Sequence, residues 1–173
     1  PAALYFYNAS DEELYRRIKE ISSITHAHFR SVFSCFIFSK FLIELLKGAD
    51  KVHAFRRVCS SVNTFALAQQ LNPQEIKLFK RILDESILIA HNESIESSGY
   101  VLATLEASLW SFLTTETFSE AVLKAVNLGD DTDTTACVTG ALAGLYYGEK
   151  AIPVKWRKVL AREQDIVMLA KDF

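Results

Sequence analysis

The chain has 173 residues, half of them hydrophobic and 23% charged, with a formal net charge of −2. That balance favours one packed domain over residues 1–173 and excludes a disordered chain, which needs fewer apolar residues. It also excludes a broadly basic protein, so we expect neither nucleic acid nor a membrane among its partners.

Residues that start and stop helices recur along the first half of the chain. Ser10 stands before "DEELYRRIKEIS", where its hydroxyl can cap a helix with an acidic first turn. Apolar residues at helical spacing follow over 25–46, and Gly48 comes next as a helix stop. Asp50 stands where it can cap the helix after that. The first half is therefore predicted to be helical.

The second half carries the same signals. Asn72 and Pro73 are typical of a helix start, and Thr117 has Glu120 at capping-box spacing. The other helices predicted in this half cover residues 101–113, 132–147 (closed by Gly148), 152–161 and 164–173. Strand signals are scarce, so we predict a single all-α domain.

The most apolar run, residues 31–46, is interrupted by Lys40 and Glu44 and is too polar for a membrane span. No secretory signal is visible in "PAALYFYNAS". The cysteines form no short-spaced pair, and each lies in an apolar helical stretch, which favours buried free thiols in a reducing compartment. They are Cys35, Cys59 and Cys137. We therefore expect a soluble cytoplasmic domain.

Two glycines, Gly140 and Gly144, lie inside a predicted helix, where each costs about 1 kcal/mol relative to Ala. With Ala136 and Ala143 they make a face of small residues. We expect a second helix to pack closely on that face. Such packing would bring the acidic start of the helix deep into the bundle.

That acidic start is "GDDTDTT" at 129–135, which gathers three carboxylates and three hydroxyls. One interpretation is helix capping by Asp130 or Asp131. A second is a site for Mg²⁺, Mn²⁺ or Ca²⁺, which take oxygen ligands. Asp131, Asp133 and Thr134 are the plausible ligands, since Thr134 follows Asp131 by three residues on the same helix face and Gly129 permits a turn.

A third interpretation is that "DTDTT" fits the D-x-D-x-T pattern of haloacid dehalogenase-type phosphatases. That pattern requires a hydrophobic strand directly before it and a parallel sheet around it. The preceding "KAVNLGD" is typical of a helix end, which argues against this alternative.

The whole block at 126–148, "VNLGDDTDTTACVTGALAGLYYG", resembles the C-terminal motif of the ADP-ribosylglycohydrolase family, which includes the dinitrogenase reductase-activating glycohydrolases. Three further segments are similar to the family and keep its order. They are "ITHAHFRS" at 24–31, "SSGYVLATLEASLWSFLTTETFSEAVLKA" at 97–125 and "IPVKWRKVLAREQDIVMLAKDF" at 152–173. The resemblance covers roughly the C-terminal half of a family member.

The resemblance implies an orthogonal multi-helix bundle with two divalent cations, Mg²⁺ or Mn²⁺, at the bottom of an ADP-ribose cleft. It implies hydrolysis of the bond between ADP-ribose and a modified protein side chain or small molecule. By position, Asp131, Asp133 and Thr134 would be the metal ligands, and Asp130 would support them or cap the helix. The catalytic base is not assigned.

The resemblance also implies substrate-binding residues. His26 matches a Thr-His motif near the bound ADP-ribose, although a local hydrogen bond explains it equally well. Ser98, Gly99 and Tyr100 match a loop that lines the cleft, where Gly99 permits close approach and Tyr100 can stack on a ring. A structural role for Tyr100 is the alternative.

One family feature is absent from these 173 residues, namely the acidic-threonine motif of the N-terminal half. We therefore expect that half to be missing, cation binding to be weak, and a complementary fragment or self-association to cover exposed helix faces such as 29–41 and 140–145. A non-catalytic structural remnant of the fold is the alternative function. The sequence leaves open which ADP-ribosylated residue or metabolite is cleaved.

Overall fold

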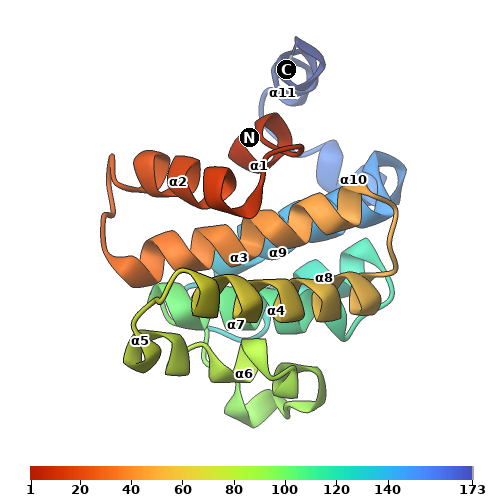
Figure 1. Cartoon of the computed structure of the whole chain (residues 1–173). Helices are drawn as coiled ribbons and strands as arrows, with labels where there is room; N and C mark the ends of the chain where they lie inside the picture. Colours follow the sequence, from red (N-terminus) through yellow and green to blue (C-terminus); the bar gives the residue numbers. More distant parts are fainter. Residues whose placement is uncertain (173) are drawn as a thin grey trace.

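A computed structural model describes residues 1–172 as a bundle of helices (Figure 1). No strand occurs in these residues, which confirms the predicted all-α class. Their helices, with η marking 3₁₀ segments, are α1 Ala2–Tyr5, α2 Asp11–Ser22, α3 Phe29–Leu46, α4 Lys51–Ala68, α5 Pro73–Lys77, α6 Lys80–Leu83, η1 Ser86–Ile89, η2 Asn92–Ser94, α7 Val101–Leu113, α8 Phe118–Val126, α9 Thr132–Tyr147, η3 Glu149–Ala151, α10 Val154–Arg157 and α11 Glu163–Asp172.

The predicted helix starts are confirmed by their capping hydrogen bonds. Each predicted cap accepts from a backbone N–H in the first turn that follows it. The residues are Ser10, Asp50, Asn72 and Thr117. The phosphatase interpretation is wrong, because the segment before Gly129 forms α8 and not a strand.

The helix predicted over 25–46 begins four residues later than expected. The backbone N–H of Arg30 donates to His28 Nδ1 at 3.2 Å, so His28 is the N-cap of α3. The preceding residues form a turn, in which Ser22 Oγ donates to the His26 carbonyl at 2.8 Å. This turn leaves His26 between α2 and α3. At the other end of the chain, Phe173 of the last predicted helix lies outside the described residues.

Helix α3 lies at the centre of the core and packs against α1, α2, α4, α7 and α9. Its side chains Phe33, Phe36 and Phe41 are fully buried. The Phe41 ring meets Phe55 of α4 and Phe112 of α7, with ring centroids 5.7 and 5.8 Å apart. Burial of large aromatic side chains is a main source of folding free energy.

The two faces that we expected a partner to cover, residues 29–41 and 140–145, are in large part buried within this chain. The aromatic side chains of the first face already lie inside the core of this chain. On the second face, Leu142 and Ala143 are fully buried. This burial arises because α4 packs on α3 and α8 packs on α9, whereas Cys35 and Ala141 remain exposed.

Helix α8 packs on the small-residue face of α9, as predicted. A Cβ atom on Gly140 would lie 3.9 Å from Val122 Cγ2, and one on Gly144 would lie 3.8 Å from Phe118 Cε2. These are ordinary contact distances, so the packing leaves room for a methyl group. The acidic start of α9 is not deep in the bundle, because Asp130 and Asp133 are exposed.

The carboxyl end of α9 is fixed by a buried lysine. Lys51 Nζ donates to the Thr115 carbonyl and to Tyr147 Oη, the latter at 3.1 Å. Tyr147 Oη in turn donates to the same Thr115 carbonyl at 3.0 Å. These bonds, together with an ion pair from Lys51 Nζ to Glu116 Oε1 at 3.4 Å, satisfy Lys51, which is only 4% exposed, and they join the end of α9 to the α7–α8 turn.

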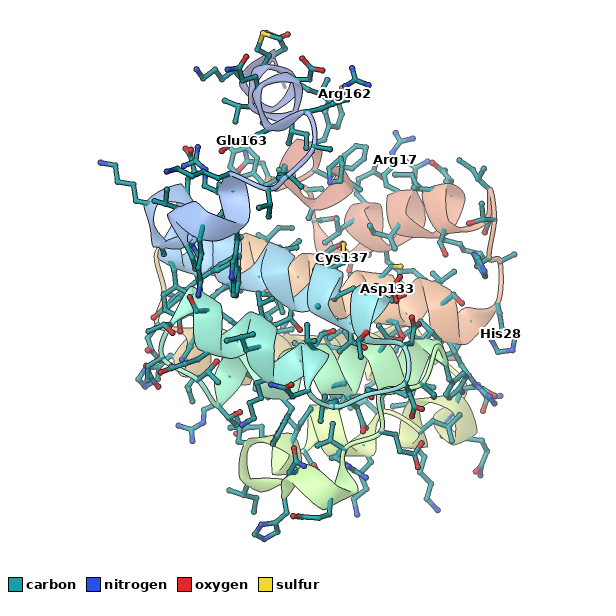
Figure 2. All side chains as sticks on the ribbon, turned by 180° about the vertical axis from the view of Figure 1, so that it is seen from behind. Arg17, His28, Asp133, Cys137, Arg162 and Glu163 are labelled. Atoms are coloured by element: carbon teal, nitrogen blue, oxygen red, sulfur yellow. The ribbon has the colours of Figure 1, made fainter. Side chains whose placement is uncertain are left out.

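The expected burial of the cysteines is confirmed only for Cys59. Cys35 and Cys137 are exposed, and all three thiols are free. Figure 2 shows Cys137 one helical turn beyond Asp133 along α9. Burial raises the pKa of the Cys59 thiol to about 12. The apolar neighbours of Cys35 and Cys137 in sequence misled the prediction, since each lies on the open side of its helix.

Helix α11 has no buried residue and lies at the top of Figure 1, apart from the central helices. Its Ile166, Met168 and Leu169 are exposed. Among residues 1–172, no helix combines the length and the apolar character needed to cross a bilayer.

Replacing Gly140 with Ala tests the packing of α8 on α9. Because the added methyl fits and Ala favours the helix, Gly140→Ala is expected to raise the free energy of unfolding by up to about 1 kcal/mol. Urea unfolding measures the change. Gly148→Ala is the matched control: Gly148 has φ +80°, where a side chain is strained, so this variant should be less stable than the parent. A loss of stability in Gly140→Ala would show that the two helices have no space for the methyl.

Thiol counting tests the corrected cysteine environments. With a thiol-specific reagent at neutral pH, two thiols are expected to react in the native protein, and Cys59 only after denaturation, since its thiol is buried and protonated. The variant Cys59→Ala should show the same native count as the parent. A native count of three would contradict the burial of Cys59.

Candidate functional site

A cavity of about 870 Å³ lies between α1 and α2 on one side and α3, α7 and α9 on the other. Much of its wall is apolar, with Ile21, Phe38 and Leu42 among the lining residues. The polar part of the wall includes four residues that matter below. They are His26, Arg30, Tyr100 and Thr134. A largely apolar cavity with a few convergent polar groups is the usual form of a small-molecule site.

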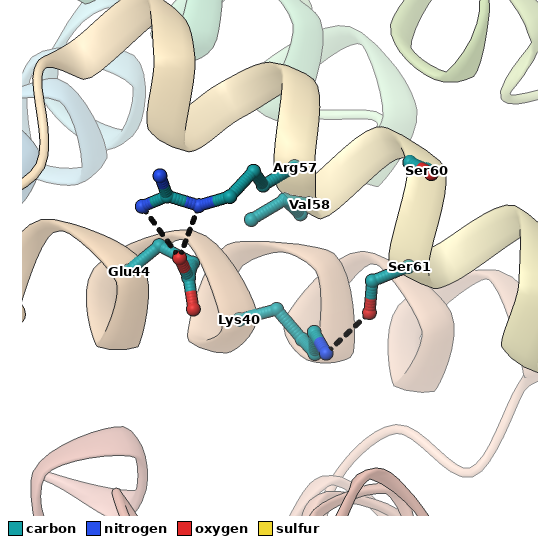
Figure 3. A pocket seen from close by; sticks show the side chains of 6 residues that line it. All are labelled: Lys40, Glu44, Arg57, Val58, Ser60 and Ser61. Carbon is teal, nitrogen blue, oxygen red and sulfur yellow. Dashed lines mark hydrogen bonds and ion pairs between the residues drawn. The ribbon is translucent and has the colours of Figure 1, made fainter.

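A second, smaller cavity of about 330 Å³ lies between α3 and α4 (Figure 3). Its charged side chains already have partners: Arg57 pairs with Glu44, and Lys40 pairs with Asp11 of α2. Arg57 Nε donates to Glu44 Oε2 at 2.8 Å, and Lys40 Nζ donates to Ser61 Oγ at 2.5 Å. The side chains that line this cavity therefore hold α3 and α4 together. The larger cavity is the candidate site.

The amino end of α7 forms one part of the large cavity. Gly99, Tyr100 and Val101 all line it. Tyr100 is the N-cap of α7, but its side chain makes no capping bond, and the first turn contains no acidic residue. The first N–H groups of the helix are therefore available to an anion.

Ser97 joins this end of α7 to the start of α9. The buried Ser97 hydroxyl donates to the Gly129 carbonyl at 2.8 Å, and the Asp131 N–H donates to the Ser97 carbonyl at 3.1 Å. Gly129 and Asp130 both adopt left-handed backbone conformations, with φ +88° and +51°. These two residues make the turn that the acidic block was predicted to need. The amino ends of the two helices thus lie side by side.

The Asp131 carboxylate points toward α7 and toward its own helix. Its Oδ1 accepts the Thr134 hydroxyl at 2.8 Å, which confirms the predicted common face of these residues. A Cβ atom on Gly99 would lie 3.1 Å from Asp131 Oδ2, so glycine leaves room for that oxygen. Asp131 does not cap α9 through its side chain, and the capping interpretation is therefore wrong for this residue.

Asp133 is exposed, and Figure 2 places it near the start of α9. Thr134 is exposed to the cavity. The donor set of Asp131, Asp133 and Thr134 consists of oxygens only, which fits a hard divalent cation. Within residues 1–172, no group of three or more His, Cys, Asp and Glu side chains is arranged to hold a metal ion. The described residues by themselves therefore do not form a complete coordination sphere.

The predicted substrate-binding residues divide into two groups. His26, Gly99 and Tyr100 come together in the cavity wall. His26 Nδ1 also lies 2.9 Å from Thr25 Oγ1, so the local hydrogen bond is present as well. Ser98 supports the wall from behind, because its carbonyl accepts the Thr104 hydroxyl at 3.2 Å.

A sequence model of the family described as ADP-ribosylglycohydrolase matches residues 1–173. The chain belongs to this family. The resemblance drawn from "VNLGDDTDTTACVTGALAGLYYG" is thereby confirmed.

Individual proteins similar to this chain support its place in the ADP-ribosylglycohydrolase family. The ADP-ribosylarginine hydrolase Tri1 of Serratia proteamaculans is 35% identical over 87% of this chain and 37% of its own length. That of Pseudomonas putida is 34% identical over 87% of this chain and 37% of its own length. A solved ADP-ribosylglycohydrolase-related protein complex superposes with a TM-score of 0.79 at 31% identity, over 98% of this chain and 55% of that one. The chain thus spans little more than a third of the length of these curated relatives.

Arg30, in the first turn of α3, was not among the predicted site residues. Arg30 Nη1 donates to Tyr100 Oη at 3.0 Å, and two further guanidinium nitrogens donate to the Glu75 carboxylate. Its partners are 45 and 70 residues away along the chain, so no spacing in the sequence pointed to the contact.

Proposed function

We propose that the protein hydrolyses the glycosidic bond between ADP-ribose and a modified arginine side chain, with Mg²⁺ or Mn²⁺ as cofactor. Family membership supports the reaction class. The two Tri1 relatives, named ADP-ribosylarginine hydrolases, support arginine over another side chain or a small metabolite. One observation carries the proposal: a single cavity wall includes the uncapped amino end of α7 and Thr134 at the start of α9, whose hydroxyl donates to Asp131.

The amino end of α7 is the part of the site suited to the diphosphate of ADP-ribose. Its free N–H groups and helix dipole favour a negative charge, and no acidic side chain in the first turn opposes one. Gly99 has no side chain that would hold a ligand away from the backbone. Tyr100 offers a ring at the same place, 47% exposed, that can stack on a base or a ribose face.

The start of α9 is the part of the site suited to the metal. The Thr134 hydroxyl donates a hydrogen bond to Asp131 Oδ1. The lone pairs of its oxygen therefore remain available to a ligand on the open side. Asp131 Oδ2 lies in the space that Gly99 leaves. Asp131, Asp133 and Thr134 would hold a divalent cation here, which would supply orientation of the ribose hydroxyls and activation of a water for attack at the anomeric carbon.

Activity also depends on sequence beyond these residues. Asp131, Asp133 and Thr134 supply too few oxygens for two complete coordination spheres. The curated relatives are much longer than this chain, which supports further ligands and the general base coming from elsewhere in the protein or from a complementary fragment. Alone, the chain should therefore bind cations weakly.

The decisive experiment removes the Asp131 carboxylate from the full-length protein. Asp131→Ala is expected to lower Mn²⁺ affinity and the release of ADP-ribose from an ADP-ribosylarginine peptide, each by at least about tenfold. Calorimetry measures the metal, and mass spectrometry measures the released ADP-ribose. An ADP-ribosylserine peptide, run in parallel, tests the choice of arginine.

Asp84→Ala is the matched control, because the Asp84 carboxylate also accepts a nearby hydroxyl, from Ser86 at 2.6 Å, but does not line the cavity. It should leave both readouts unchanged. Full activity in Asp131→Ala would overturn the proposal. Absence of Mn²⁺ binding at millimolar metal in the parent protein would instead favour the non-catalytic structural alternative.

A second test uses Gly99. In Gly99→Ala the new methyl would lie 3.1 Å from Asp131 Oδ2, which is closer than a Cβ atom normally approaches, so the carboxylate must shift. We expect Mn²⁺ affinity to fall several-fold, measured by calorimetry. Gly140→Ala, on the same helix bundle but away from the carboxylates, should leave the affinity unchanged. An unaltered Mn²⁺ affinity in Gly99→Ala would show that Asp131 Oδ2 takes no part in metal binding.

A further inference from the structure

Arg30 connects three segments that meet at the wall of the large cavity. It lies in the first turn of α3, contacts Glu75 in the first turn of α5, and contacts Tyr100 at the N-cap of α7. Arg30 and Tyr100 both line the cavity. Through Arg30, α5 is connected to a site that it does not line.

The contact with Glu75 is bidentate. Arg30 Nε donates to Glu75 Oε2 at 2.7 Å, and Arg30 Nη2 donates to Glu75 Oε1 at 3.0 Å. Two parallel bonds fix the plane of the guanidinium as well as its position. The guanidinium holds the pKa of the Glu75 carboxyl below its usual value, so the pair stays charged through the neutral range.

The remaining arm of the guanidinium reaches Tyr100. Arg30 Nη1 donates to Tyr100 Oη at 3.0 Å, so the phenol oxygen is an acceptor there and its own proton remains free to donate. Since the ring is otherwise half exposed, this bond limits its rotation about the side-chain torsions. The ring is thereby held in the wall of the cavity.

We propose that Arg30 is a positioning residue, and that its guanidinium, braced by Glu75, sets the orientation of the Tyr100 ring that receives ADP-ribose. The inference rests on the proposed function, which makes Tyr100 a substrate contact. Preorganising an aromatic side chain improves affinity because less freedom is lost on binding. Arg30 acts through Tyr100, so its contribution depends on the phenol oxygen.

Arginine is required at this position by geometry rather than by charge. A lysine has a single ammonium group and cannot bridge a carboxylate and a phenol in one plane. Arg30→Lys should therefore behave like Arg30→Met. If Arg30 instead attracted the diphosphate by its charge, Arg30→Lys would retain most of the affinity.

The ion pair of Arg57 with Glu44 is the matched control, since it also joins two helices through an Arg–Glu contact and lies in the other cavity (Figure 3). Arg57→Met removes a comparable pair without touching the large cavity. Any effect that both variants share reports on helix packing alone.

The experiment measures ADP-ribose affinity by calorimetry in the full-length protein carrying Arg30→Met, Arg30→Lys, Tyr100→Phe, the double change Arg30→Met with Tyr100→Phe, or Arg57→Met. Arg30→Met and Arg30→Lys are each expected to weaken binding about fivefold, as for the loss of one hydrogen bond. In the Tyr100→Phe background, Arg30→Met should add nothing. Arg57→Met should bind as the parent does.

Each outcome distinguishes the inference from the function it rests on. If the parent protein does not bind ADP-ribose, the proposed function fails first. If the parent binds and Arg30→Met binds equally well, only the role of Arg30 fails. An undiminished effect of Arg30→Met in the Tyr100→Phe background, or retained binding in Arg30→Lys, would also overturn positioning through the phenol. KM should rise with kcat less affected, since the ring contacts substrate before and during reaction alike.

Discussion

The attachment of α9 at both of its ends is the constraint on which the site depends. At the amino end, the Asp131 N–H donates to the Ser97 carbonyl. At the carboxyl end, Tyr147 and Lys51 share the Thr115 carbonyl. Between these points, α8 and α7 pack along the helix. A helix fixed in this way cannot slide along its axis, so its first turn keeps one position relative to α7.

That fixed position brings two kinds of chemistry to one wall. The amino end of α7 offers backbone N–H groups, which attract anions, whereas the start of α9 offers carboxylate and hydroxyl oxygens, which attract cations. Groups of opposite preference so close together suit an anionic group and a cation bound side by side. The absence of a side chain at Gly99 allows the two ends to approach, because any Cβ atom there would press on Asp131.

Several features of this arrangement could be predicted from the sequence, and others could not. Caps such as Ser10 and Thr117 were predictable because a cap and the N–H groups that it accepts from are neighbours in the chain. The Asp131–Thr134 contact was predictable for the same reason. The exposure of Cys35 and Cys137 was not, because it depends on which face of a mostly apolar helix the other elements cover.

By itself, the sequence determined the helical class, most helix ends, the family resemblance and the common face of Asp131 and Thr134. All of these follow from local hydrogen bonding, from periodicity or from a continuous motif. Only the tertiary structure decided that Ser97 joins two loops, that Lys51 is buried, and that Arg30 reaches Glu75 and Tyr100. The physical reason is that these contacts join segments tens of residues apart, and the packing of the helices around α3 alone sets which distant groups meet.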